Sequence, residues 1–159
     1  MLHTLAAIRI ASAICLVALL PLSHAQTSPQ PRMNRNAVAV TSVNPAAVNV
    51  EKINFAGEAI VNSRVALDPD FNQPSLIVLF DLSNITAVGA QSGTRYVVSS
   101  QEYVIQPLAP NQNIDFTFPM TTDVNAPLEM ARTGSAHFVL QVDLLTGVVR
   151  TNAAVFSAR

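Results

Sequence analysis

The feature that most constrains the fold is an alternation of apolar and polar residues with a period of two. It is clearest in residues 114–120, where Phe116 is predicted to be a central core residue, and it recurs in residues 53–62 and 136–144. Such alternation places successive side chains on opposite faces of an extended strand. No long segment follows the 3.6-residue period of a helix, so the chain is expected to be all-β.

Further strands complete the expected fold. Leu76 to Leu82 is apolar at nearly every position, which predicts a central strand covered on both faces, and residues 96–98 and 103–105 predict two shorter strands. A turn at residues 145–147 returns the chain through residues 148–156. About seven to eight strands with regular turn signals favour an antiparallel β-sandwich, immunoglobulin-like or related, with a closed barrel as the alternative.

The first 25 residues have the pattern of a signal peptide. Arg9 precedes an apolar run over residues 10–20, and Ser23 and Ala25 supply the small residues that signal peptidase requires. A membrane anchor, the alternative, needs about 20 continuous apolar residues, and this run is shorter. We therefore expect cleavage after Ala25 and export to the periplasm or the extracellular space.

The rest of the chain is predicted to hold one folded domain. Residues 26–36 contain two prolines and no apolar periodicity, which favours a flexible tether. Residues 37–159 contain all the predicted strands and are long enough to bury a core. The predicted organisation is therefore a signal peptide over residues 1–25, a tether over 26–36 and a single β-sandwich domain over 37–159.

The charge and cysteine content exclude several functional classes. The chain has nine basic and ten acidic residues, and removal of Arg9 with the leader leaves eight against ten. Such a balance does not favour nucleic acid, which needs an excess of basic groups. Cys15, the single cysteine, also leaves with the leader, so neither disulfides nor thiolate chemistry are expected. The mature chain contains no predicted membrane span.

Catalytic residues are not predicted. His137 is the single histidine of the mature chain, and a histidine base needs an orienting acid and an adjacent nucleophile. Asp143 lies six residues further along the same predicted strand, about 20 Å away in an extended chain. His137 is therefore expected to be a surface residue of its strand.

The loop over residues 68–74 is the candidate contact region, with Asp68, Asp70, Phe71 and Asn72 as its predicted contact residues. Two prolines stiffen this segment, which lowers the entropy lost on binding, and Phe71 either contacts a partner or covers the end of the core. The oxygens of Asp68, Asp70 and Asn72 have the spacing that opens a calcium loop.

The calcium pattern then fails. Gln73 replaces the glycine of such a loop, and Leu79 replaces the closing glutamate, so a turn capped by its own side chains is favoured. A weak Ca²⁺ site completed by Asp81 or Asp123 remains as the alternative.

Two other groups of residues favour structural roles. Asp81 follows an apolar segment and is expected either to pair with Arg95 or to cap the backbone of residues 83–87. Tyr96 and Tyr103 with Arg95 are too few to form a stacking surface for sugars or bases, so packing within the sheets is favoured.

These observations predict a non-catalytic secreted or periplasmic interaction module that uses sheet edges or loops to bind another envelope or extracellular protein. No cofactor or metal is predicted. A structural subunit of a surface assembly is the first alternative, since the predicted surface is rich in uncharged polar residues. An enzyme or metal-dependent binder built around Asp68, Asp70 and Asp81 is the second alternative.

Overall fold

The computed structural model describes residues 33–44, 51–68, 70, 72–122 and 131–158. The predicted signal peptide and residues 26–32 of the predicted tether lie outside these residues. All regular elements in the described ranges are β-strands, which confirms the all-β prediction. No helix in them is long and apolar enough to cross a membrane.

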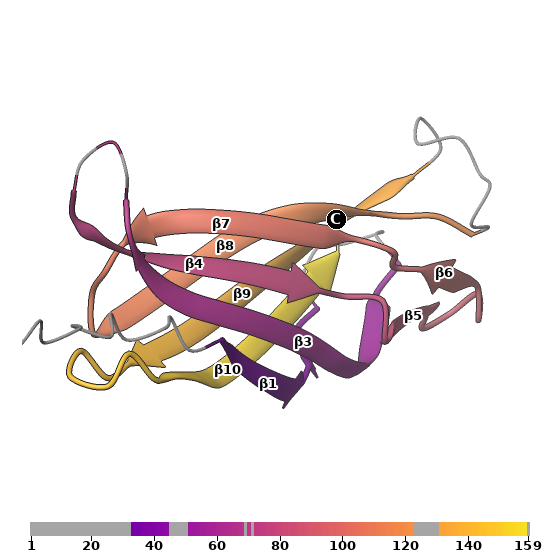
Figure 1. Ribbon diagram of the computed structural model, residues 1–159. Coiled ribbons are helices and arrows are strands. Elements are labelled where there is room, and N and C mark those ends of the chain that lie inside the picture. The colour runs from indigo at the N-terminus through magenta and orange to yellow at the C-terminus, as the bar shows by residue number, and fades with distance from the viewer. Residues whose placement is uncertain (1–32, 45–50, 69, 71, 123–130, 159) are drawn as a thin grey trace, which may run out of the picture.

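In the described part of the chain, ten strands form two sheets, and all neighbouring strands except one pair are antiparallel. The strands are β1 (Asn34–Ala39), β2 (Thr41–Ser42), β3 (Ile53–Leu67), β4 (Pro74–Asp81), β5 (Ile85–Gly89), β6 (Arg95–Val97), β7 (Gln101–Pro107), β8 (Asn111–Met120), β9 (Arg132–Val142) and β10 (Val149–Ala158). Sheet 1 has the order β6-β5-β3-β4-β7, with β1 also paired to β3. Sheet 2 has the order β2-β10-β9-β8, and Figure 1 shows its strands lying across those of sheet 1.

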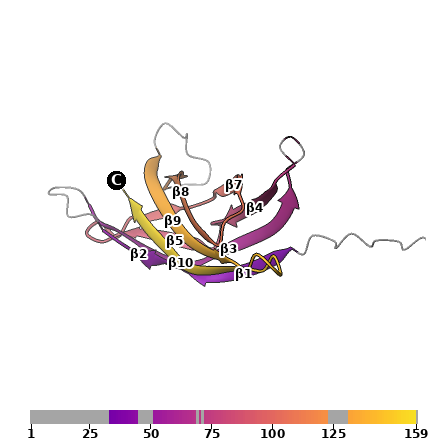
Figure 2. The ribbon, with the colours of Figure 1, turned by 90° about the vertical axis from the view of Figure 1, so that its left-hand side faces the viewer.

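The first strands pass from one sheet to the other. β1 pairs antiparallel with β3, whereas β2, only one residue later, pairs parallel with β10. The side-chain amides of Asn34 and Asn36 donate to the carbonyls of Gly147 and Val149, at 3.2 and 2.9 Å. Figure 2 shows β1 and β10 side by side. The segment therefore joins the edges of the two sheets.

This pairing corrects one predicted boundary. Asn34, Arg35 and Asn36 belong to β1, although they fall within the predicted tether of residues 26–36. The sequence gives no apolar alternation there because backbone pairing and asparagine amides, rather than burial of large side chains, hold this part of the strand.

The core lies between the two sheets and contains a chain of aromatic contacts. The ring of Phe80 in β4 lies 4.4 Å from that of Phe138 in β9, measured between ring centroids. Phe138 in turn contacts Phe156 of β10, which contacts Phe55 of β3. Phe80, Phe138 and Phe156 are completely buried. These rings link sheet 1 to sheet 2 at two places, through Phe80 and through Phe55.

Strand β3 runs through an irregularity at Gly57, where the sequence predicts a long strand with or without a bulge. Residues 53–57 pair with β5, residues 60–67 pair with β4, and the turn over residues 82–84 lies between the two pairings. Gly57 has a φ of 117°, and a Cβ added there would collide with the carbonyl oxygen of Asn84. Only glycine combines this backbone conformation with so close an approach.

We therefore expect Gly57→Ala to lower the free energy of unfolding by about 1–3 kcal/mol, because it adds backbone strain and a steric collision. Chemical denaturation measures this loss. Gly93→Ala is the matched control, since Gly93 also has a positive φ, 68°, but no atom would lie near its Cβ. An equal loss in both variants would show that the collision with Asn84 contributes nothing.

Phe116 is less central than its sequence pattern predicts. It packs against the core, with its ring beside those of Phe80 and Phe138, but remains partly exposed, whereas Ile114 and Phe118 on the same face of β8 are buried. Phe138 occupies the middle of the same sheet and contacts three other phenylalanine rings.

Truncation of these two rings tests the difference. Phe138→Ala is expected to cost about 3–5 kcal/mol, the range for a fully buried ring. Phe116→Ala should cost clearly less when both unfolding free energies are measured by denaturant titration. A larger loss for Phe116→Ala would contradict this description of the core.

Candidate binding surface

The predicted contact loop forms a compact turn between β3 and β4. The backbone N–H of Asp70 donates to Oδ1 of Asp68 at 2.8 Å, and the N–H of Asn72 donates to the Asp68 carbonyl at 2.8 Å. Asn72 has a φ of 50°, a left-handed conformation that asparagine tolerates. Phe71 lies outside the described residues. Asp68 thus caps its own backbone, as the turn interpretation predicts.

The structure does not bring Asp81 to this loop. Asp81 ends β4 and the loop precedes its start at Pro74, so seven residues of strand, about 23 Å, separate them. Among the described residues, no group of three histidine, cysteine or acidic side chains is placed to hold a metal ion. A Ca²⁺ site assembled from Asp68, Asp70 and Asp81 is therefore wrong, and Asp123 lies outside the described residues.

Asp81 caps a turn, as one of its two predicted roles requires. Its Oδ1 accepts a hydrogen bond from the backbone N–H of Ser83 at 3.0 Å. Hydrogen bonds from the Ser83 backbone and side chain, with a smaller contribution from the Arg35 guanidinium, hold the pKa of Asp81 below its usual value. Arg95 lies in β6 with an exposed side chain.

His137 has an acidic partner that sequence spacing did not reveal. Its Nδ1 lies 2.7 Å from Oδ1 of Asp115, which β8 places directly opposite His137 in β9. The neighbouring Ser135 hydroxyl is hydrogen-bonded to that of Ser157 at 2.8 Å. These groups line a shallow depression of about 430 Å³ on the outer face of sheet 2. His137 is partly exposed, in agreement with its predicted surface position.

Tyr96, Tyr103 and Arg95 do not form a common stacking surface. The Arg132 guanidinium lies 5.6 Å from the centre of the Tyr96 ring and 3.3 Å from its hydroxyl. Arg132 also pairs with Glu51 at 3.5 Å, and hydrogen bonds from Ser92 lower the pKa of Glu51. This cluster fastens the start of β9 to the β5–β6 turn. Tyr103 lies elsewhere, in β7.

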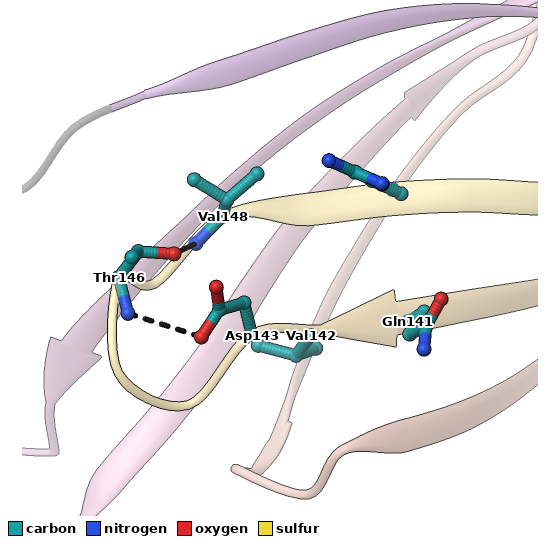
Figure 3. A pocket seen from close by; sticks show the side chains of 6 residues that line it. Gln141, Val142, Asp143, Thr146 and Val148 are labelled. Atoms are coloured by element: carbon teal, nitrogen blue, oxygen red, sulfur yellow. Dashed lines mark hydrogen bonds between the residues drawn. The ribbon is translucent and has the colours of Figure 1, made fainter.

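A depression of about 570 Å³ lies at the β9–β10 hairpin and is shown in Figure 3. The Asp143 carboxylate there accepts the backbone N–H groups of Leu145 and Thr146, at 2.9 and 3.3 Å. Hydrogen bonds from the Thr146 side chain and these two N–H groups lower the pKa of Asp143. The carboxylate of Asp143 therefore holds the turn through these hydrogen bonds. Leu145, at the tip of the turn, is 98% exposed.

We expect Asp143→Ala to lower Tm at neutral pH, because the turn loses its acceptor. Since the folded-state pKa of Asp143 is lowered, its stabilisation is complete above the unfolded pKa, about 3.9, and is lost as pH falls through the folded value. Thermal melts from pH 7 to 2 should show the two proteins converging at the acidic end. A constant difference in Tm would show that ionised Asp143 does not stabilise the turn.

The outer face of sheet 1 carries an apolar patch formed by Ile77, Leu79, Tyr103 and Ile105. Ile77 lies directly opposite Ile105 and Leu79 opposite Tyr103, in the register of β4 with β7. Tyr103 is 56% and Ile105 53% exposed, and Ile77 and Leu79 are partly exposed. The prediction that β4 is covered on both faces is therefore wrong: only its inner face, on the core, is buried. Periodicity showed that both faces are apolar but not what covers them.

Beside this apolar patch, Met33 and Arg64 help to line a depression of about 440 Å³ that includes Ile77, Leu79 and Tyr103. Met33 is 70% exposed and the Arg64 side chain is also exposed. The apolar patch is therefore bordered by Arg64 on the side of β3, and on the side of β7 it reaches the edge of sheet 1.

Strand β7 forms an open edge of sheet 1. The Ser100 carbonyl accepts from Leu82, and the Leu108 N–H donates to Pro74, so the backbone groups of the even-numbered residues face β4. The N–H and C=O groups of Gln101, Tyr103 and Ile105 therefore face outward. Among the described residues, no strand pairs with this side of β7.

Comparison of the chain with protein-family models, with curated proteins and with solved structures finds no match. The two features that the described residues leave exposed together are the apolar patch and the open backbone of β7 beside it.

Proposed function

We propose that this protein is a non-catalytic secreted or periplasmic interaction module that binds a protein partner by adding the partner's apolar strand to β7. Export is inferred from the predicted signal peptide. The observation that carries the proposal is the apolar patch that reaches the open edge of the sheet through Tyr103 and Ile105. Main-chain hydrogen bonds would supply affinity, and alternate side chains would supply specificity.

The edge of sheet 2 differs from the edge of sheet 1, and the difference favours β7 over β8 as the strand to which a partner is added. The edge strand β8 of sheet 2 presents Asn113, Asp115 and Thr117 outward, and Pro119 lacks a backbone donor. Charged groups and proline protect edges from pairing. β7 carries a single charge, Glu102, and its proline stands at its last position. Strand addition is therefore favoured at β7.

We also propose that the two sheets form a β-sandwich, immunoglobulin-like or related. The shared core and the passage of the first strands from sheet 1 to sheet 2 support this class. After these first strands, β3 to β7 all belong to sheet 1 and β8 to β10 all belong to sheet 2, which favours a related connectivity over the seven-strand immunoglobulin order.

The predicted contact loop lies beside the same edge. Asp68 and Gln73 line a small depression of about 200 Å³ together with Ile105 and Pro107 of β7. In this proposal the loop over residues 68–74 borders the bound strand and adds polar contacts to its end. Asp70, Phe71 and Asn72 remain predicted contact residues.

A structural subunit of a surface assembly is the second candidate function. The specific observation in its favour is that the described strands include two long edge strands of different sequence, β7 in sheet 1 and β8 in sheet 2. Pairing of β7 with β8 of the next copy would be heterologous and could continue without limit. Light scattering of the purified protein separates such open-ended growth from binding of a different partner.

Site-specific photo-crosslinking tests the binding surface. A photoreactive residue at position 105 should form adducts with another envelope or extracellular protein in cells that export the chain, because Ile105 faces outward at the open edge. Positions 137 and 145 are controls, since His137 lies on sheet 2 and Leu145 at a hairpin tip. Strong adducts at the controls with none at position 105 would contradict the proposal.

The affinity of such a complex should depend little on salt. The patch is apolar and the hydrogen bonds of strand addition join backbone groups, so we expect Kd to change less than about threefold between low salt and 0.5 M salt. Titration of a captured partner at several salt concentrations measures this. A steep loss of affinity with salt would show that charged groups dominate recognition.

A further inference from the structure

We infer that β7 pairs with β7 of a second copy of this chain, antiparallel and with Val104 opposite the partner's Val104. This inference rests on the proposed strand-addition function and specifies its occupant. Three independent properties of β7 support it: the direction of its free backbone groups, the side chains on its outer face and the side chains on its inner face.

The free backbone groups fit this register. With the twofold axis at Val104, Tyr103 lies opposite the partner's Ile105, and both residues have outward-facing N–H and C=O groups. They exchange two hydrogen bonds, and the symmetry repeats the pair. Val104 forms the non-hydrogen-bonded pair at the centre, as it must, because its own backbone groups face β4.

On the outer face, pairing makes the apolar patches of the two copies continuous. Tyr103 would contact the partner's Ile105, and each of these already lies beside an apolar residue of β4, Leu79 or Ile77. Aromatic and β-branched residues opposite each other are among the favourable cross-strand pairs. The half-exposed Tyr103 and Ile105 would each gain a neighbour on the side now open.

On the inner face, the register gives a partner to a buried polar group. Nε2 of Gln106 is buried and has no hydrogen-bond acceptor among the described residues. Its position lies opposite Glu102 of the partner subunit, whose carboxylate is an acceptor. Nε2 is covered by its own chain in the monomer, so the Gln106 side chain must rotate toward the open edge to reach this carboxylate. The dimer contains this pair twice, and each amide then gains an acceptor while the one charge of β7 faces a donor.

Each register leaves some groups unmatched. The Val104 register places Gln101 opposite the partner's Pro107, but among the three registers it alone places Gln106 opposite the partner's Glu102. An axis at Tyr103 would place Glu102 opposite the partner's Val104 and Gln106 opposite the partner's Ser100, which leaves the carboxylate facing an apolar side chain. An axis at Ile105 would place Tyr103 opposite the partner's Pro107, which has no N–H and whose carbonyl already accepts from Gln112 at 2.8 Å. The Val104 register is therefore favoured.

Cysteine crosslinking tests both the pairing and its register. In exported Cys15→Ser protein, Val104→Cys should form a disulfide-linked dimer under mild oxidation, because opposite residues of a non-hydrogen-bonded pair have Cα atoms about 4.5 Å apart, within disulfide range. Tyr103→Cys is the matched control and should stay monomeric. A dimer from Tyr103→Cys alone, or from neither variant, would overturn the proposed register.

Substitutions of Glu102 and Gln106, the pair on the inner face, test whether their side chains interact across the dimer. Sedimentation of the wild-type protein should show a monomer–dimer equilibrium at protein concentrations up to about 0.5 mM. Concentrations this high also populate dimers with small, transient interfaces. Gln106→Glu should weaken the dimer about tenfold or more, since it opposes two carboxylates, and Glu102→Gln/Gln106→Glu should restore it. Thermal melts establish that each variant folds.

Two outcomes separate this inference from the proposed function. A wild-type protein that stays monomeric at every concentration, but whose position 105 crosslinks to a different protein, would overturn self-pairing and retain strand addition. No adduct of any kind at position 105 would overturn both. Species larger than a dimer would also contradict the inference, because a twofold pair uses the one β7 edge of each copy and closes at two.

Discussion

The contact between Phe80 and Phe138 is the interaction on which the rest of the structure depends. It joins the middle of sheet 1 to the middle of sheet 2, with ring centroids 4.4 Å apart and no exposure of either ring. Val104 of the edge strand β7 packs against the same core. The sequence predicts a mature chain without cysteine and therefore without a disulfide. Burial of such aromatic rings is then the main source of stability.

Because the core is formed by the inner faces of the two sheets, the side chains on the outer faces are not constrained by core packing. The two outer faces differ in polarity. Sheet 2 presents a polar face that includes the Asp115–His137 pair and the serine pair beside it. Sheet 1 presents an apolar patch that ends at an unpaired strand. An exposed apolar face next to free backbone groups favours association, whereas a polar face with internally paired groups favours solvent. This difference supports assigning recognition to sheet 1.

Local features of the fold were predictable from the sequence. The period-two pattern predicted β8 and β9, and the composition of the loop at Asp68 predicted a self-capped turn. Features that depend on which strands are neighbours were not. Asp115 reaches His137 only through the β8–β9 register, across 22 positions of sequence.

Coverage of a face by a second layer was also not predictable. Ile77 is as apolar as the buried residues beside it, and no local pattern tells whether solvent or another sheet lies above it. The early start of β1 at Asn34 was missed because its strand pairing is long-range and involves few apolar side chains.

The central claim is that β7 is an open edge at which another strand is added, and amide hydrogen exchange measured by NMR tests it most directly. In dilute protein, the N–H groups of Tyr103 and Ile105 should exchange rapidly, while that of Val104, which faces β4, should be protected. On association, whether with a second copy or with a different partner, protection of Tyr103 and Ile105 should rise to that of Val104. Equal, strong protection of all three in dilute monomer, or no change on association, would contradict the account.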